Sequence, residues 1–232
     1  FGDYFAAVDV KGEKNRIERN ELYNSGRFLV MHYDSGQLRI EYNKMHGSGK
    51  LTSDLGATYE WGTDGRGSVI AYNWIYDCNG NGIYLDNFSE NFVLHHNVIH
   101  DVTTRGIMLN SDSLNNKVYH NTVFNLGSGY DSFYSFAYSG YQLTNRGSEI
   151  KNNIYNGGVT LATGSTAPVM SNNAVITALN DKFIPESTEA IRDKGEFIEG
   201  INDYYTGEKP DIGAYELGGE YWIPGPDWSL EN

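Results

Sequence analysis

The chain has 232 residues, of which 39% are hydrophobic and 20% are charged, and its formal net charge is −13. This length fits one domain with a sizeable hydrophobic core. The acidic balance argues against nucleic-acid binding, the lone Cys78 excludes an intrachain disulfide, and no apolar run is long enough to insert into a membrane.

The start of the chain, Phe1, is not a native initiator residue. We therefore expect that an N-terminal part of the native protein is missing, including the element that would cover the first coil. A solenoid needs such a cap because its terminal repeats otherwise expose their cores.

A phrase centred on asparagine recurs from residue 16 onward. An aliphatic residue stands three positions before the asparagine and another stands two after it, as in VIAYNWI and VLHHNVI. The asparagines are Asn20, Asn43, Asn73, Asn97 and Asn121, with weaker repeats at Asn153 and Asn173. A period of about 20–30 residues with short alternating strands indicates a solenoid.

Equal offsets predict that like residues stack in successive coils, about 4.8 Å apart. We expect an inner aliphatic column, an aromatic column that also accounts for most of the histidines, and an asparagine ladder at a bend, where Asn itself would take the left-handed conformation. The repeat length suits three short strands per coil. The sequence thus predicts an all-β fold, a right-handed parallel β-helix over about 15–125, with handedness from the preference of parallel crossovers.

A second strand of each coil begins at a glycine, namely Gly56, Gly82 and Gly106. Four residues after each glycine stand Glu60, Asp86 and Asn110, which we expect to share the outer face of one sheet. Two carboxylates on neighbouring coils would repel, so one would hold a proton at neutral pH. A protonated and an ionised carboxyl group are what a glycosidase needs. Acidic residues at strand ends are, equally, often only solvated.

The excursion over 52–67 is the longest among the regular coils, and it adds Asp54, Tyr59, Trp61 and Asp64 to this face. The substrate-binding candidates around it are Trp61, Tyr84, Asp64, Asn110 and Tyr59. Aromatic rings suit sugar binding, although ordinary packing also explains them. His32 lies outside the stacked columns and is a candidate general acid or base.

The later part of the chain departs from the regular pattern. We expect a long aromatic and glycine-rich loop over 126–148, degraded coils over 149–176, and a C-terminal cap over 177–232 with a short helical stretch at 186–200. No spacing typical of a dedicated metal site occurs. We expect no cofactor, with Ca²⁺ as the one possible ion, held by acidic loops.

The residues over 51–77 (LTSDLGATYEWGTDGRGSVIAYNWIYD) and 80–102 (GNGIYLDNFSENFVLHHNVIHDV), with HNTV and the closing DIGAYE, resemble bacterial β-helix glycoside hydrolases of the pectate-lyase-like superfamily. In such relatives the acids of the two phrases lie in the active-site face. The resemblance therefore implies roles for Asp54 and Asp86. This chain has Asn87 where relatives often carry a second Asp.

Three functions follow from these features. The first is a secreted, periplasmic or cell-surface bacterial glycoside hydrolase that acts on a polysaccharide as a monomer. The second is a polysaccharide lyase, which needs basic residues beside its base; Arg66, Arg105 and Lys117 are scattered, so it ranks second. The third is a non-catalytic glycan-binding or structural β-helix, for which the aromatic residues suffice.

Overall fold

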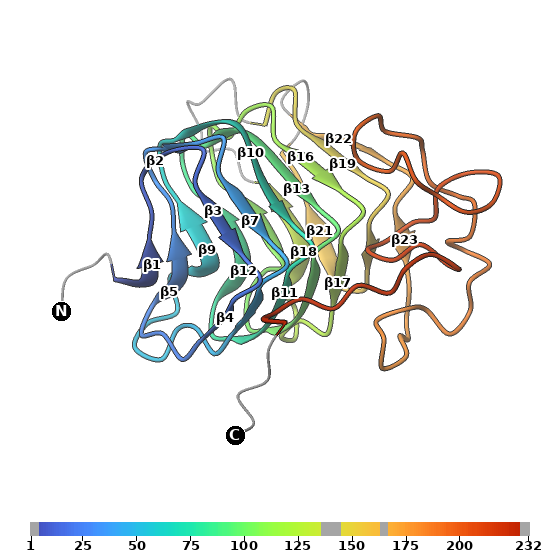
Figure 1. Ribbon diagram of the computed structural model, residues 1–232, viewed down its shortest axis with the longest axis horizontal. Coiled ribbons are helices and arrows are strands. Elements are labelled where there is room, and N and C mark those ends of the chain that lie inside the picture. The colour runs from blue at the N-terminus through green and yellow to red at the C-terminus, as the bar shows by residue number, and fades with distance from the viewer. Residues whose placement is uncertain (1–4, 136–144, 163–166, 228–232) are drawn as a thin grey trace.

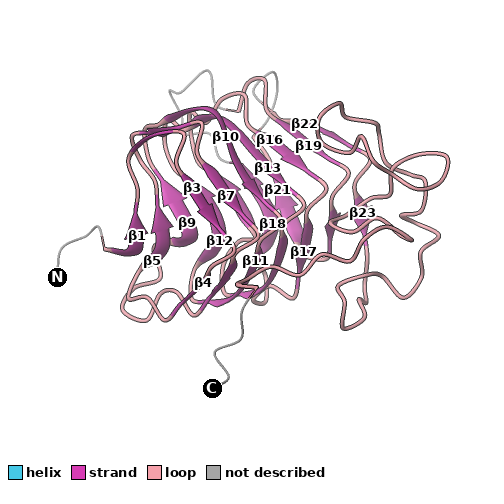
Figure 2. Cartoon of the chain, viewed as in Figure 1, coloured by secondary structure: helices cyan, strands magenta, loops and turns pink. Residues whose placement is uncertain are grey.

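The computed structural model describes residues 5–135, 145–162 and 167–227. Throughout these ranges the regular secondary structure is β-strand, joined by turns and bends (Figure 2). None of the described segments forms a helix that could cross a bilayer. The prediction of a helical stretch at 186–200 is wrong. This segment is a series of turns, in which the Arg192 amide donates to the Thr188 carbonyl.

Three parallel sheets of seven strands each run along the solenoid (Figure 1). Sheet 1 contains β1 (Ala6–Asp9), β5 (Phe28–Met31), β9 (Gly56–Glu60), β12 (Asn81–Leu85), β15 (Ile107–Leu109), β18 (Asp131–Ser135) and β21 (Gly158–Thr160). Sheet 2 contains β3 (Arg16–Glu18), β7 (Arg39–Glu41), β10 (Asp64–Ala71), β13 (Glu90–His95), β16 (Lys117–Tyr119), β19 (Glu149–Lys151) and β22 (Val169–Ser171). Sheet 3 contains β4 (Glu21–Tyr23), β8 (Lys44–His46), β11 (Trp74–Cys78), β14 (Val98–Val102), β17 (Thr122–Phe124), β20 (Ile154–Tyr155) and β23 (Ala174–Val175). A short pair, β2 (Gly12–Glu13) and β6 (Ser35–Gly36), lies beside them.

Each coil takes one strand from each sheet in turn, so the chain is a parallel β-helix with three strands per coil, as the repeat predicted. Its regular part begins earlier than expected, at β1. The loop expected over 126–148 contains β18, whose Ile107–Phe133 pairing continues sheet 1. Its tyrosines Tyr138 and Tyr141 lie outside the described residues.

The asparagine ladder is present at the bend between sheets 2 and 3. The Asn73 side-chain amide donates to Asn97 Oδ1 at 3.0 Å, and the Asn97 amide donates to Asn121 Oδ1 at 3.0 Å. Equivalent bonds continue the ladder at both ends, from Asn20 to Asn173. The left-handed residue, however, is the one before each asparagine, such as Tyr72 with φ of 56° and His96 with φ of 52°. This conformation leaves the asparagine amide free to bond along the axis.

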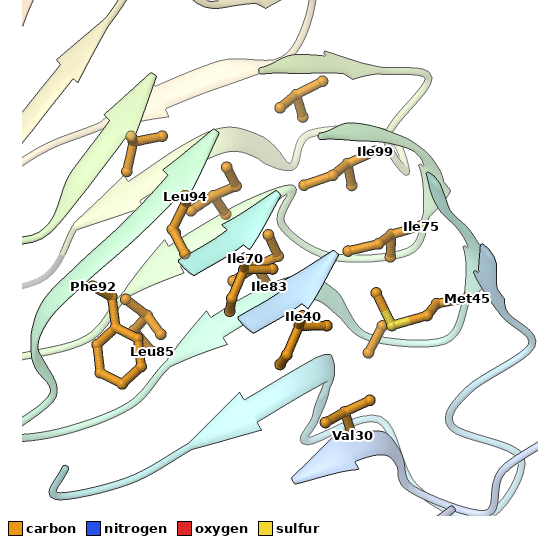
Figure 3. Packing of buried hydrophobic residues seen from close by; sticks show 14 of the residues in the cluster. Val30, Ile40, Met45, Ile70, Ile75, Ile83, Leu85, Phe92, Leu94 and Ile99 are labelled. Atoms are coloured by element: carbon orange, nitrogen blue, oxygen red, sulfur yellow. The ribbon is translucent and has the colours of Figure 1, made fainter. Parts of the chain in front are cut away.

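Aliphatic side chains fill the interior as stacked columns (Figure 3). Ile40, Ile70 and Leu94 follow one another on sheet 2, and Met45, Ile75 and Ile99 do so on sheet 3. All six are at most 1% exposed, so the packed column removes each from water over its whole surface.

Aromatic rings stack along the outside, as expected. On sheet 3, Tyr23, His46, Tyr76 and His100 follow one another with ring centroids 4.8–5.3 Å apart. At the asparagine bend a second column contains Tyr42, Tyr72, His96 and His120, with neighbouring centroids 4.7–5.0 Å apart. These contacts give His96 and His120 a structural role.

The C-terminal segment covers the last coils and then turns back. Ile191 and Ile212 pack on Ile154 and Ala174 at the end of the solenoid. The chain then runs back along the outside towards earlier coils, as the red trace in Figure 1 shows. The Gly225 amide donates to the Tyr42 carbonyl at 2.8 Å, which fixes this strap to the asparagine bend.

Candidate functional site

The outer face of sheet 1 carries a band of large side chains. Tyr59 pairs with Tyr84, and Tyr84 pairs with Met108, so these residues lie side by side on three successive coils. Phe28, Met31 and Leu55 complete the cluster. The ends of the sheet 1 strands lie beside this packed band of side chains.

Asp86 follows the end of β12 and is the best-held carboxylate of this face. Tyr59 Oη donates to Asp86 Oδ2 at 2.8 Å, and Asn110 Nδ2 donates to Asp86 Oδ1 at 2.6 Å. The backbone amide of Asn87 also donates to Asp86 Oδ1, at 2.8 Å. Three donors from three consecutive coils fix the carboxylate in one orientation while it stays partly exposed. The sequence correctly predicted that Asp86 and Asn110 lie side by side on this face.

Glu60 does not lie on this face, so the expected pairing of Glu60 with Asp86 is wrong. Gly56 pairs with Asn81 rather than with Gly82, and Glu60 consequently pairs with Leu85, whose side chain is in the core. A shift of one residue turns every side chain of a strand to the other face. With this pairing Tyr59 lies beside Tyr84 on the outer face, and Thr58 lies beside Ile83 in the core.

Glu60 is instead fully buried. Burial, and secondarily the charge of Asp86, raises the pKa of the Glu60 carboxyl well above its ordinary value. Burial therefore favours the neutral form of this carboxyl group. In the described part of the chain, neither of its oxygens has a hydrogen-bond partner of normal geometry.

His32 is also inside the coil and does not face the candidate site. Its backbone amide donates to the Tyr59 carbonyl at 3.0 Å, which places His32 beside Glu60 on the preceding coil. Burial lowers the pKa of His32 to about 3, and its ring lies 5.8 Å from that of Phe92. A fully buried imidazole cannot contact a polymer outside, so a catalytic role for His32 is contradicted.

Asp54 lies at the start of this face, where it is exposed. Arg27 Nη2 lies 3.4 Å from Asp54 Oδ2, and Arg27 Nε donates to the Asp54 carbonyl at 3.0 Å. Burial, followed by the charges of Asp86 and Asp54, raises the pKa of Tyr84 above its ordinary value. Both carboxylates therefore act electrostatically on the same phenol. Tyr84 Oη also accepts from Asn110 Nδ2, at 3.2 Å.

Aromatic side chains project at the far end of the strands. Trp61 is 52% exposed and packs edge-on against Phe88, which is 48% exposed, with centroids 6.4 Å apart. They follow β9 and β12, next to Asp86. By contrast, Asp64 binds the Asn91 amide at 2.7 Å and the Arg66 amide at 2.9 Å, which is a local structural role.

Two other aromatic residues have structural roles: Phe133 is in the core, while Trp74 donates to Tyr215 Oη at 3.0 Å and packs under the C-terminal strap. Neither Phe88 nor Arg27 was selected from the sequence. Phe88 is two residues after Asp86 in the chain, and Arg27 contacts Asp54 in the structure. Arg105, with its guanidinium 4.1 Å from the Tyr134 ring centroid, adds a second cation to this face. Arg66 and Lys117 instead form ion pairs with Glu13 and Glu149 on other parts of the surface.

No group of three or more His, Cys, Asp or Glu side chains suited to a metal ion is found within the described ranges.

Comparison with known proteins gives the following matches. A family model described as a right handed beta helix region matches residues 2–123. Among solved structures, the crystal structure of pectate lyase Pel9A is similar, with a TM-score of 0.59 and 15% sequence identity over 91% of this chain and 67% of that chain. No curated protein matches. At this identity the structural likeness concerns the fold.

Proposed function

Because the chain belongs to the right-handed β-helix family, we propose that it is a polysaccharide-degrading enzyme whose active site is the outer face of sheet 1. The carboxylate of Asp86 carries the proposal, since three donors hold it on a partly exposed face beside exposed aromatic rings. Oriented carboxylates and ring faces are what glycan cleavage requires. Such substrates imply a place of action outside the cytoplasm.

A glycoside hydrolase is the first candidate, with Asp86 and Asp54 as its two carboxyl groups. One of them protonates the leaving oxygen while the other activates a water molecule or attacks the sugar. We assign Asp86 to the ionised role, because all three of its polar neighbours donate to it. Asp54, on the exposed side, would be the second carboxyl group. Trp61 and Phe88 would hold adjoining sugar units.

A polysaccharide lyase is the second candidate, and the positions of Arg27 and Arg105 favour it. A lyase must neutralise the carboxylate of a uronic acid while a base removes the neighbouring proton. Arg27 and Arg105 flank the Tyr59–Tyr84–Met108 band, where such a carboxylate would meet them. The pectate lyase that shares the fold acts on pectate, as its name says.

The test is an Asp86→Asn substitution assayed on plant and algal polysaccharides. We expect activity to fall at least about a hundredfold, since the amide can neither accept a proton nor attack. The Asn side chain has nearly the same shape, so folding should persist, as circular dichroism can check. Asp77→Asn is the matched control, because Asp77 is an exposed acid on sheet 3.

The product distinguishes the candidates. A lyase leaves an unsaturated sugar that absorbs near-ultraviolet light, whereas a hydrolase leaves only a new reducing end. If the wild-type chain cuts no polysaccharide, or if the Asp86→Asn protein cuts as fast as the wild type, the proposed function is wrong.

A further inference from the structure

A concave site lies on the side of the coil opposite to sheet 1. A cleft of about 710 Å³ runs along the asparagine bend, between the column Tyr42–Tyr72–His96–His120 and two C-terminal segments, 200–205 and 213–223. Its volume lies in the range of about 300–1,000 Å³ that small-molecule sites occupy. The bend joins sheets 2 and 3, so the cleft does not border sheet 1.

The rings on the solenoid wall of the cleft are stacked on one another, and Trp222 meets Tyr42 and Tyr72 at nearly right angles, with centroids 6.3 and 5.4 Å away. Stacking occupies the faces, since Tyr42 and Tyr72 are nearly parallel at 4.7 Å and His96 lies 4.9 Å beyond. Tyr42 and Tyr72 both line the cleft and carry hydroxyl groups. Among the described residues, neither hydroxyl group forms a hydrogen bond. These hydroxyls can therefore bind a ligand without first losing a protein partner.

His96 adds a further polar group. Its Nδ1 lies 2.9 Å from His95 Nδ1, and within the described chain no partner is seen for its other ring nitrogen. The ring is partly exposed and lines the cleft. Burial, and then the neighbouring rings of His120 and His95, lowers the pKa of His96 well below its ordinary value, so that it is neutral at neutral pH.

The charges around the cleft select against anions. Asp203, Glu216 and Glu220 line it, and the one cation among its lining residues, Arg19, lies 3.0 Å from Asp227. A sulfate, a phosphate or a uronate would meet net negative charge here. Neutral hydroxyl groups would instead meet acceptors and donors together.

The loop wall supplies an exposed ring. Tyr204, on the segment 200–205, is 98% exposed although it lines the cleft. Covering the face of an exposed aromatic ring removes apolar surface from water, which is favourable. The C–H face of a sugar ring can make this contact. Tyr204 thus provides the stacking surface that the solenoid wall lacks.

We propose that this cleft binds a short neutral oligosaccharide, as a second glycan site apart from the face that bears Asp86. The choice of a sugar rests on the proposed function, while the preference for a neutral one rests on the charges of the cleft. Because the two sites lie on different sides of the coil, a polymer held here would leave the face of sheet 1 open to another part of the same material. The cleft would raise the local concentration of substrate.

The test uses Asp86→Asn protein, so that a ligand is not consumed, and isothermal titration with cello-, xylo- and manno-oligosaccharides and with oligogalacturonate. Tyr204→Ala removes the exposed ring, and Tyr72→Phe removes one hydroxyl. We expect each change to weaken binding of the neutral ligand by roughly tenfold. Tyr23→Ala is the matched control, since Tyr23 is 54% exposed and heads the other aromatic column, so binding should stay unchanged.

The proposal is overturned if none of the neutral ligands binds, if oligogalacturonate binds the cleft as tightly, or if both tyrosine variants bind like their parent. Retained folding of Tyr204→Ala is assured by the exposure of its side chain. Loss of the proposed function would appear separately, as unchanged cleavage by Asp86→Asn protein. The two proposals can therefore fail independently: the cleft can lack oligosaccharide binding in a protein that cleaves polysaccharide, and a protein without cleavage activity can still bind oligosaccharide at the cleft.

Discussion

An Asn97→Ala substitution tests how much the ladder stabilises the coil. The Asn97 side chain donates to the Ile70 carbonyl at 2.8 Å and to Asn121 Oδ1 at 3.0 Å. It accepts from the Asn73 backbone amide at 3.2 Å and from the Asn73 side-chain amide at 3.0 Å. Alanine removes all four bonds at a site that water does not reach.

The expected loss follows from these contacts. Each intramolecular hydrogen bond contributes about 0.5–1.5 kcal/mol net, so four give roughly 2–6 kcal/mol. The value should fall in the upper half of that range, because the Asn73 amide would be left buried and unpaired. Stabilities of native domains are about 5–15 kcal/mol, so the variant would lose a large part of its free energy of unfolding.

Urea unfolding followed by tryptophan fluorescence measures this loss as a shift of the midpoint. Asn20→Ala is the matched control, since Asn20 is exposed at the end of the ladder and its side chain only donates, to Asn43 Oδ1 and to the Glu18 carbonyl. Water can replace those bonds, so the control should lose less than about 1 kcal/mol. Equal losses in both variants would refute the reasoning.

Three further predictions concern buried ionisable groups and the Asp86 site. Three buried histidines, His32, His95 and His120, have pKa values lowered to about 3, about 3 and about 4, and the pKa of the partly exposed His96 is also lowered. The contribution of these histidines to stability is complete above pH 6.5 and is lost as pH falls towards the lowered pKa values, whereas the raised pKa of Glu60 acts in the opposite direction. Near pH 5 each of the three buried histidines takes up about one proton on unfolding, so stability should drop by up to about 4 kcal/mol per pH unit. A flat profile of urea midpoints between pH 7 and 5 would contradict this. Glu60→Met should raise the free energy of unfolding by about 1–3 kcal/mol at pH 7, and this gain should shrink as pH falls towards 4.5. The variant should also retain activity, so a folded but inactive variant would show that Glu60 belongs to the site. Tyr59→Phe should lower kcat by roughly tenfold, because it removes one hydrogen bond to Asp86. The free energy of unfolding, measured with urea, should change by no more than about 1 kcal/mol. An unchanged kcat would show that Tyr59 does not belong to the site.

The repeat determined the architecture because it is local and periodic. Identical offsets around Asn73, Asn97 and Asn121 place like side chains on like in successive coils, and a parallel solenoid turns that identity into a ladder and into columns. The outward position of Asp86 and Asn110 followed in the same way, since β12 and β15 keep the spacing of the repeat.

The tertiary structure decided the features that depend on one residue of register or on contacts far apart in the chain. Gly56 and Gly82 look equivalent in the sequence, but Gly56 pairs with Asn81, so Glu60 turns into the core. The cleft likewise depends on Gly225 docking on Tyr42, a contact without periodicity. Alternation and repeat length specify which residues stack, whereas the lengths of individual loops and the path of the last segment are set only when the whole chain packs.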